Sequence, residues 1–342
     1  MKMMNRNNAN GKMQKIWVLV TWVVAVAMLM SACGQAQTPK VYKVGVLIGL
    51  GFASPIADGF KSEMTKLGYV EGENIVYDVQ VTDFDIAGYQ TILKKFVADK
   101  VDLILVSPTE ATIEAKTLTQ GTDIPVIFSF AFTEGMGIID SVREPGGNIT
   151  GVRYPGVDIT LKRFEMMREL VPDVKRIWMP YQRGYPIVAP QLEALEPLAK
   201  TEGVTLIPFP ADNAAELQAE LEARSAAEDV GMDAILFLVE PLMVSPDPFA
   251  AVAKFAYEQE IPMGGVYYST GEYTSIFGVN ADFVEYGQLA APLADKIFKG
   301  TPAGTIPAVS PSQFIQINYT IAQQFGLTVP EGLLKQADEI IR

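Results

Sequence analysis

Short apolar runs alternate with longer amphipathic stretches along most of the chain. In the first half, the runs are rich in β-branched residues, which predicts buried strands at residues 42–48, 75–81, 103–106 and 125–130. The stretch that follows Pro55 places Ile56, Phe60 and Met64 on one helical face, and Gly68 ends it. The first half therefore predicts strands that alternate with helices.

The second half repeats this alternation. We expect strands at residues 176–180, 205–209 and 234–239, and helices at 159–170, 188–200, 214–227 and 249–259. This order predicts an α/β fold with two doubly wound parallel-sheet lobes that face a cleft. Ligands of such sheets bind outside the carboxyl ends of the strands.

The first 40 residues have a different pattern. Four basic residues precede an uncharged run at 16–30, which ends at the small residues Ser31 and Ala32 followed by Cys33. This order is typical of an export signal. The run is short for a hydrocarbon core of about 30 Å, so a retained membrane anchor is the less favoured alternative.

Residues 29–33 resemble a bacterial lipobox, in which the cysteine is lipidated and becomes the new N-terminus. We therefore expect a signal peptide at 1–32, a lipid on Cys33, a tether at 33–41, and an exported protein anchored to the cell membrane. A small buried hydrophobe is the alternative role for Cys33.

Composition narrows the function. The 342 residues include no histidine, one cysteine, 40 acidic and 27 basic side chains. The absence of histidine removes the commonest general base and every His-containing metal site, and a single cysteine excludes a Cys-cluster metal site. The net charge of −13 argues against binding to nucleic acid. We expect no cofactor, no metal and no catalysis. An enzyme that uses carboxylate pairs, lysine or Ser/Lys chemistry is the alternative.

Two sequence blocks carry a family resemblance. Residues 68–74 read Gly-Tyr-Val-Glu-Gly-Glu-Asn, and residues 145–152 read Pro-Gly-Gly-Asn-Ile-Thr-Gly-Val. With supporting patterns at 96–104, 123–126 and 330–334, they resemble the ABC-transporter substrate-binding lipoproteins of the tryptophan/tyrosine-receptor type. The resemblance implies a monomeric receptor that closes on a small solute and delivers it to an ABC permease and its ATPase. A sensor domain of the same fold is a further alternative.

The resemblance also implies the periplasmic-binding-protein type I fold, in which a three-crossing hinge joins the lobes. The crossings are expected near 152–155, 278–280 and 309–312, and helix 283–298 is expected to return to the first lobe. The N-terminal lobe would then comprise 42–152 and 280–308, and the C-terminal lobe 153–279 and 309–342.

The candidate ligand-binding residues lie at the ends of the predicted strands and at the second crossing. They are Gly51, Phe52, Ser107, Pro108, Thr109, Ser129, Phe130, Phe132, Tyr181, Tyr185, Glu240, Tyr267, Tyr268 and Asn280.

The seven aromatic residues of this set predict a slot for a planar ligand. Backbone amides after Gly51 and Pro108 are candidates to bind an anionic group. Thr109 is equally well placed to be only the N-cap of its helix. Glu240 is the best partner for a cationic edge, and a solvated loop carboxylate is its alternative role. Arg183 is a weaker candidate for an anionic solute.

These residues predict a flat solute with a cationic or donor-rich edge. An aromatic amino acid and a nucleobase-like or pyrimidine heterocycle are the two candidates. The positions where the resembled family commonly has Asp hold other residues here, which weakens the first candidate. The candidate set contains few of the Asp, Asn and Arg side chains that usually bind the hydroxyl groups of a polyol, so a sugar is a less expected solute.

Overall fold

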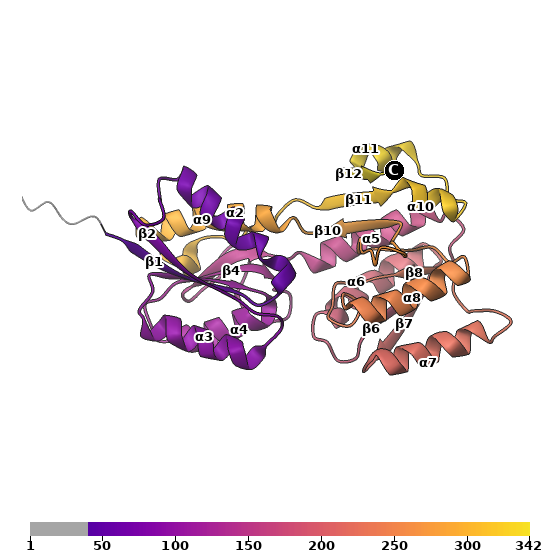
Figure 1. The fold of residues 1–342 in the computed structure, drawn as a ribbon, viewed down its shortest axis with the longest axis horizontal. Coiled ribbons are helices and arrows are strands. Elements are labelled where there is room, and N and C mark those ends of the chain that lie inside the picture. Colours follow the sequence, from indigo (N-terminus) through magenta and orange to yellow (C-terminus); the bar gives the residue numbers. More distant parts are fainter. Residues whose placement is uncertain (1–39) are drawn as a thin grey trace, which may run out of the picture. The chain divides into compact units, whose positions relative to one another are not determined.

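The apolar runs of the first half form one parallel sheet (Figure 1). The computed structural model describes residues 40–342, so the expected signal peptide and Cys33 lie outside the described residues. The strand order is β2-β1-β3-β4-β5. The strands are β1 (Tyr42–Ile48), β2 (Ile75–Val81), β3 (Leu103–Ser107), β4 (Val126–Ala131) and β5 (Ile149–Arg153).

Both faces of this sheet are buried, because alternate side chains enter different cores. Leu103 and Leu105 pack with α2 (Pro55–Lys66), whereas Ile104 and Val106 pack in a core with α3 (Ile86–Ala98) and α4 (Thr109–Thr119). This arrangement explains the continuous apolar character of the strand. The first lobe is the sheet together with these helices.

The second lobe has the same organisation. Its parallel sheet has the order β7-β6-β8-β9. The strands are β6 (Arg176–Gln182), β7 (Thr205–Ala211), β8 (Ala234–Leu236) and β9 (Met263–Gly264), and the helices are α5 (Gly156–Leu170), α6 (Val188–Thr201), α7 (Ala214–Ser225) and α8 (Pro246–Glu258). The fold class predicted from the sequence is confirmed. The predicted strand at 234–239 is too long: β8 ends at Leu236, because its partner β9 ends at Gly264, the residue opposite Leu236.

A third, smaller sheet departs from the all-parallel expectation. Its strands are β10 (Phe277–Asn280), β11 (Phe314–Asn318) and β12 (Glu339–Ile341), and β10 pairs with β11 in the antiparallel direction. Two short helices, α10 (Tyr319–Gln324) and α11 (Glu331–Gln336), lie between β11 and β12.

Three segments pass between the lobes. β5 leads through Tyr154 into α5, β10 leads into α9 (Phe283–Phe298), and the segment after the 3₁₀ turn Ala303–Thr305 leads into β11. The third segment pairs with the first at Val309, whose N–H donates to the Gly151 carbonyl at 2.9 Å. It pairs with the second where Asn280 lies opposite Phe314.

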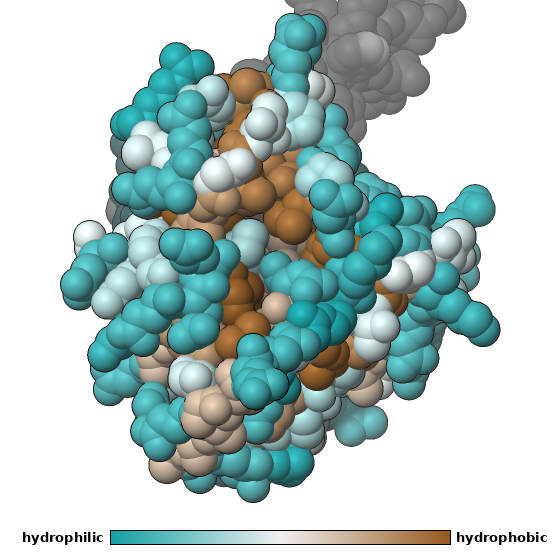
Figure 2. Space-filling view, turned by 90° about the vertical axis from the view of Figure 1, so that its right-hand side faces the viewer, coloured by the Kyte–Doolittle hydropathy of each residue, from teal (hydrophilic) through white to brown (hydrophobic). Residues whose placement is uncertain are grey.

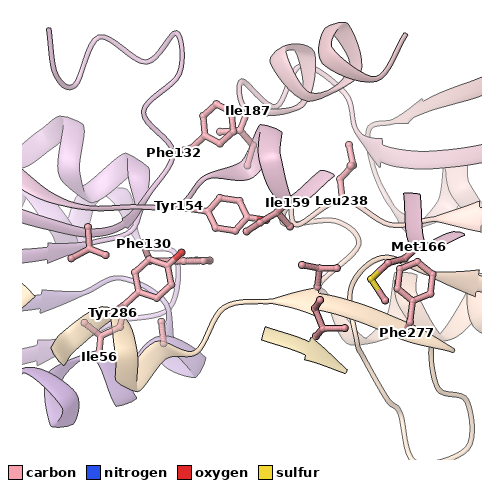
Figure 3. Close-up of a cluster of buried hydrophobic side chains, with 14 of the residues drawn as sticks. Ile56, Phe130, Phe132, Tyr154, Ile159, Met166, Ile187, Leu238, Phe277 and Tyr286 are labelled. Atoms are coloured by element: carbon pink, nitrogen blue, oxygen red, sulfur yellow. The ribbon is translucent and has the colours of Figure 1, made fainter. Parts of the chain in front are cut away.

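The cores of the lobes meet along the first crossing. Figure 3 shows Phe130, Tyr154 and Ile159 in succession from the first lobe toward the second, and all three are buried. Figure 2, which views the molecule from the right-hand side of Figure 1, shows mostly hydrophilic side chains with hydrophobic ones in hollows between them. Within residues 40–342, no helix combines the length and apolar character needed to cross a bilayer.

Candidate functional site

Two adjoining cavities lie where the strand ends of the two lobes meet. Their volumes are about 600 and about 490 Å³. Six residues line both, namely Phe52, Phe130, Tyr154, Val239, Val244 and Tyr268. Because the two cavities share these residues, which come from both lobes, we call them together the interlobe cleft. Its size suits a small organic solute.

Eleven of the fourteen candidate residues line the interlobe cleft. They are Gly51, Phe52, Pro108, Thr109, Phe130, Phe132, Tyr185, Glu240, Tyr267, Tyr268 and Asn280. Ser107 and Ser129 do not line it: both side chains are fully buried, and neither hydroxyl has a hydrogen-bond partner within the described chain. Tyr181 is half-buried and packs against the main core instead.

Phe130 reaches the cleft through an irregularity of β4. The register between β4 and β5 shifts at Ser129 to Ala131, and Phe130 has a φ of 55°, in the left-handed region. A bulge of this kind re-aims a side chain near a binding site, at a conformational cost of about 1–3 kcal/mol. The ring then packs edge-on against Tyr154 and Phe283, with centroids 5.1 Å away in each case.

Phe52 is available to a solute. It lies in the 3₁₀ turn Gly51–Ala53 and is 51% exposed, although it borders the cleft. An exposed phenyl ring at a cleft wall offers a face for stacking. Tyr268, on the opposite lobe, is held by an edge-on contact with Phe249 at 4.6 Å.

Thr109 is not an N-cap. It is the first residue of α4, Pro108 precedes the helix, and no side chain caps it. The Thr109 hydroxyl instead accepts a hydrogen bond from the Phe132 backbone N–H at 3.0 Å. This bond joins the segment after β4 to the start of α4 at the first-lobe wall of the cleft.

Glu240 is not a solvated loop carboxylate. The residue is only 2% exposed, and its side chain accepts hydrogen bonds from the backbone N–H groups of Gln182, Leu242 and Met243 at 2.7–3.0 Å. Burial raises the pKa of the carboxyl, and these three donors oppose that shift. Glu240 therefore organises the turn after β8.

Arg183 is engaged outside the cleft. Its guanidinium contacts Asp212 and Glu216, and it donates to the Pro210 carbonyl. Arg183 does not line either cavity, so the structure gives it a surface role rather than a solute contact.

Sequence reasoning missed Arg163. This α5 side chain is fully buried, and it lines the larger cavity. Its Nε and Nη2 groups donate to the Val279 carbonyl at 3.2 and 2.7 Å, and Nη1 has no hydrogen-bond partner within the described chain. Burial lowers the pKa of the guanidinium, and Tyr154 opposes that shift. Arg163 thus joins α5 to the second crossing.

Sequence reasoning also missed Glu110, the residue that follows Thr109. Its Oε1 accepts a hydrogen bond of 2.6 Å from the Tyr185 hydroxyl, so the contact joins α4 of the first lobe to the segment after β6 of the second. Burial raises the pKa of Tyr185, and the charges of Glu110 and Glu240 raise it further. Tyr185 therefore stays protonated and remains a donor.

Metal ligands do not gather in the described part of the chain. Among residues 40–342, no three His, Cys, Asp or Glu side chains are close enough to hold a metal ion.

Comparison with known proteins agrees with this architecture. Residues 44–341 match the family model described as ABC transporter substrate binding protein. A curated tyrosine-binding protein of Clostridioides difficile is 28% identical over 256 residues, which cover 74% of this chain and 70% of that protein.

Solved structures show the same fold. The chain resembles a conserved domain protein of Vibrio cholerae, with a TM-score of 0.74, 24% identity, and coverage of 88% of this chain and 100% of that one. It also resembles an ABC domain from Streptococcus pneumoniae in complex with L-Trp, with a TM-score of 0.73, 24% identity and the same coverage. A ligand-free, open substrate-binding protein of Clostridium difficile gives 0.69 at 22% identity, covering 88% and 99%.

The family model spans almost all of the described chain, and the fold agrees with it, so the resemblance carried by residues 68–74 and 145–152 is confirmed. The chain belongs to the ABC transporter substrate-binding protein family.

Proposed function

We propose that this protein is the extracytoplasmic receptor of an ABC importer, and that it captures a small, flat, aromatic solute between its lobes. The observation that carries the proposal is the interlobe cleft, to which both lobes contribute aromatic side chains. Phe52 and Phe130 come from the first lobe, and Tyr267 and Tyr268 come from the second. Opposed aromatic faces favour a planar ring system.

An aromatic amino acid is the first candidate solute. The curated relative is named for tyrosine, and one structural neighbour contains L-Trp. A nucleobase-like or pyrimidine heterocycle remains the second candidate. It would use the same aromatic faces but would not need a charged partner in the cleft.

The proposal includes delivery and anchoring. After closure of the lobes, the receptor would present the solute to an ABC permease with its ATPase, as a monomer. Residues 1–32 would be removed, and a lipid on Cys33 would hold the mature protein on the outer face of the cell membrane. The lobes would comprise residues 42–152 with 280–308, and 153–279 with 309–342.

The test begins with the solute. Freshly purified protein is denatured, and the released small molecules are identified by mass spectrometry. Calorimetry then measures the affinity of L-tryptophan, L-tyrosine and any released solute for the stripped, refolded protein. We expect an aromatic compound with a Kd near micromolar or tighter. An aliphatic solute or a polyol would contradict the proposal.

Variants locate the solute. Phe52→Ala and Tyr268→Ala each remove one aromatic wall, so each should weaken binding by roughly 5- to 30-fold. Leu67→Ala is the control, because Leu67 is also exposed but lies outside the cleft. Unchanged affinity in both cleft variants would place the solute elsewhere.

A further inference from the structure

The smaller cavity of the interlobe cleft has an unbalanced charge. Its lining includes the three carboxylates of Asp83, Glu110 and Glu240, and no lysine or arginine is among its described lining residues. Aromatic rings line the same space, including Phe52, Phe130, Phe132 and Tyr185. Carboxylates between aromatic faces favour a cationic group over a neutral or anionic one.

Two of the three carboxylates are poor candidates for direct contact with a solute. Glu240 is buried and already accepts three backbone hydrogen bonds. Asp83 is exposed, and within the described chain its carboxylate accepts a long hydrogen bond of 3.5 Å from the Gly51 N–H. Its carboxylate therefore faces solvent at an edge of the cleft.

Glu110 differs from both. Its Oε1 is occupied by the Tyr185 hydroxyl, whereas its Oε2 is buried and has no hydrogen-bond partner within the described chain. A buried carboxylate oxygen without a donor is costly, so it marks a place where a donor is missing. Glu110 also lies in the first turn of α4, where the helix dipole favours a negative charge.

We propose that Glu110 binds the ammonium group of the solute through Oε2. This inference rests on the proposed function, because it assumes that the cleft holds an aromatic solute. It narrows the solute class to flat rings that carry a primary amine, which includes aromatic amino acids and excludes neutral heterocycles. An ammonium group supplies the missing donor and the missing positive charge together.

The same contact links recognition to closure of the lobes. Tyr185 belongs to the second lobe, and Glu110 belongs to the first. When both oxygens of Glu110 are engaged, one carboxylate joins the solute and the second lobe. A solute without an amine leaves Oε2 unpaired in the closed cleft, so it is rejected by the cost of that buried oxygen.

The test compares probes that share a ring but differ in the amine. Calorimetry at pH 7.5 on stripped protein uses L-tryptophan, tryptamine and 3-indolepropionate, and the matching tyrosine series of L-tyrosine, tyramine and 3-(4-hydroxyphenyl)propionate. One of the two series should bind. Within that series, the amine that binds more tightly should have a Kd at least about 30-fold lower than the Kd of the propionate. Equal affinity for the propionate would overturn the inference and leave the aromatic receptor intact.

Variants assign the effect to one residue. Glu110→Gln keeps the shape but removes the charge, so it should weaken the amine probes by about 30-fold or more and change the propionate by less than about threefold. Glu114→Gln is the matched control, because Glu114 lies one turn further along α4, pairs with Gln90 and does not line the cleft. An amine affinity that Glu110→Gln leaves unchanged would overturn the inference.

Failure of the proposed function has a different signature. If no probe of either series binds the parent protein, an indole or phenol solute is wrong. The solute released on denaturation then decides the inference: a compound with a basic amine whose affinity depends on Glu110 supports it, and a compound without one overturns it.

Discussion

Gly287 of α9 lies directly against the backbone of Ile56 in α2. A Cβ atom built on Gly287 would be 2.0 Å from the Ile56 carbonyl oxygen, far inside contact distance. The helices approach equally closely at Gly59, where a Cβ would be 2.1 Å from the Val284 carbonyl oxygen. These glycines let α9, which follows the second crossing, dock against the first lobe.

Gly287→Ala should therefore destabilise the protein. The obstructing atoms belong to the backbone, so the helices must separate, and a cost of about 1–3 kcal/mol is expected. Chemical denaturation measures the free energy of unfolding. Gly332→Ala is the control, because a Cβ at that position of α11 would have no atom within 4 Å apart from its chain neighbours and the backbone of its own helix. Equal stability of the two variants would show that the helices do not pack this closely.

Arg163→Ala should lower stability by about 2–4 kcal/mol. The substitution leaves the Val279 carbonyl without its two donors and opens a cavity, and these costs exceed the relief of removing a buried charge. Arg143→Ala, at an exposed position, should change the free energy of unfolding by less than about 0.5 kcal/mol. A similar small change in both variants would mean that Arg163 does not stabilise the hinge.

The buried carboxyl of Glu240 should make the free energy of unfolding depend on pH. Burial raises the pKa of its carboxyl above the usual 4.5, so the folded protein binds a proton that the unfolded chain releases. The free energy of unfolding should therefore fall as the pH rises from about 4.5 through the raised pKa. Glu240→Gln lacks this ionisation, so the parent should lose stability relative to the variant across that window. Urea denaturation at several pH values measures the difference.

Exposed Glu331 provides the comparison for this experiment. Its side chain is 80% exposed, so Glu331→Gln should change the free energy of unfolding by less than about 0.5 kcal/mol. A Glu240→Gln curve that runs parallel to the parent curve would show that Glu240 has the same pKa in the folded and unfolded states.

Cys33→Ser should release the protein from the membrane or block its processing. Two or three acyl chains, at about 0.8 kcal/mol for each buried methylene, would hold an acidic protein on a bilayer. Detergent partitioning and intact-mass measurement detect the lipid and the new N-terminus. Gln35→Ala should partition as the parent does. Normal processing and partitioning of Cys33→Ser would rule out lipidation at this position.

The sequence predicted regular elements best where their signals are local. Residues 42–48 and 75–81 form β1 and β2 with the predicted bounds, because the apolar pattern that indicates each strand lies within its own segment. Residues 283–298 form α9 with the bounds that the family resemblance implied. The strand expected directly after Pro262 is found as β9. The antiparallel pairing of β10 with β11 was not predicted. This pairing depends on which segments become neighbours, which a local pattern does not contain.

In the candidate site, too, the residues with a local sequence signal were predicted and the others were missed. The rule that ligands lie at strand ends identified most residues that line the cleft. It missed Glu110 and Arg163, because both are on helices, where a polar residue usually indicates a solvated face. It also missed why Phe130 faces the cleft, because a bulge has no signal in an apolar run. Glu110 directly follows the candidate Thr109, and that position was its only sequence signal.

The pairing of the three crossings has a consequence for solute size. The third crossing is tied to the first at Val309 and to the second at Phe314, and no backbone–backbone hydrogen bond within the described chain engages the four residues 310–313 between them. Side chains hold this link instead: the Ser312 N–H donates to Glu285 Oε1 at 3.1 Å, and Arg153 Nε donates to the Ser310 hydroxyl at 2.8 Å. The three crossings are thus bonded to one another, and Pro311 has a fixed φ within the link. We therefore expect the crossings to bend together when the lobes rotate, so that the hinge, and not only the cleft walls, should limit the bulk of the solute.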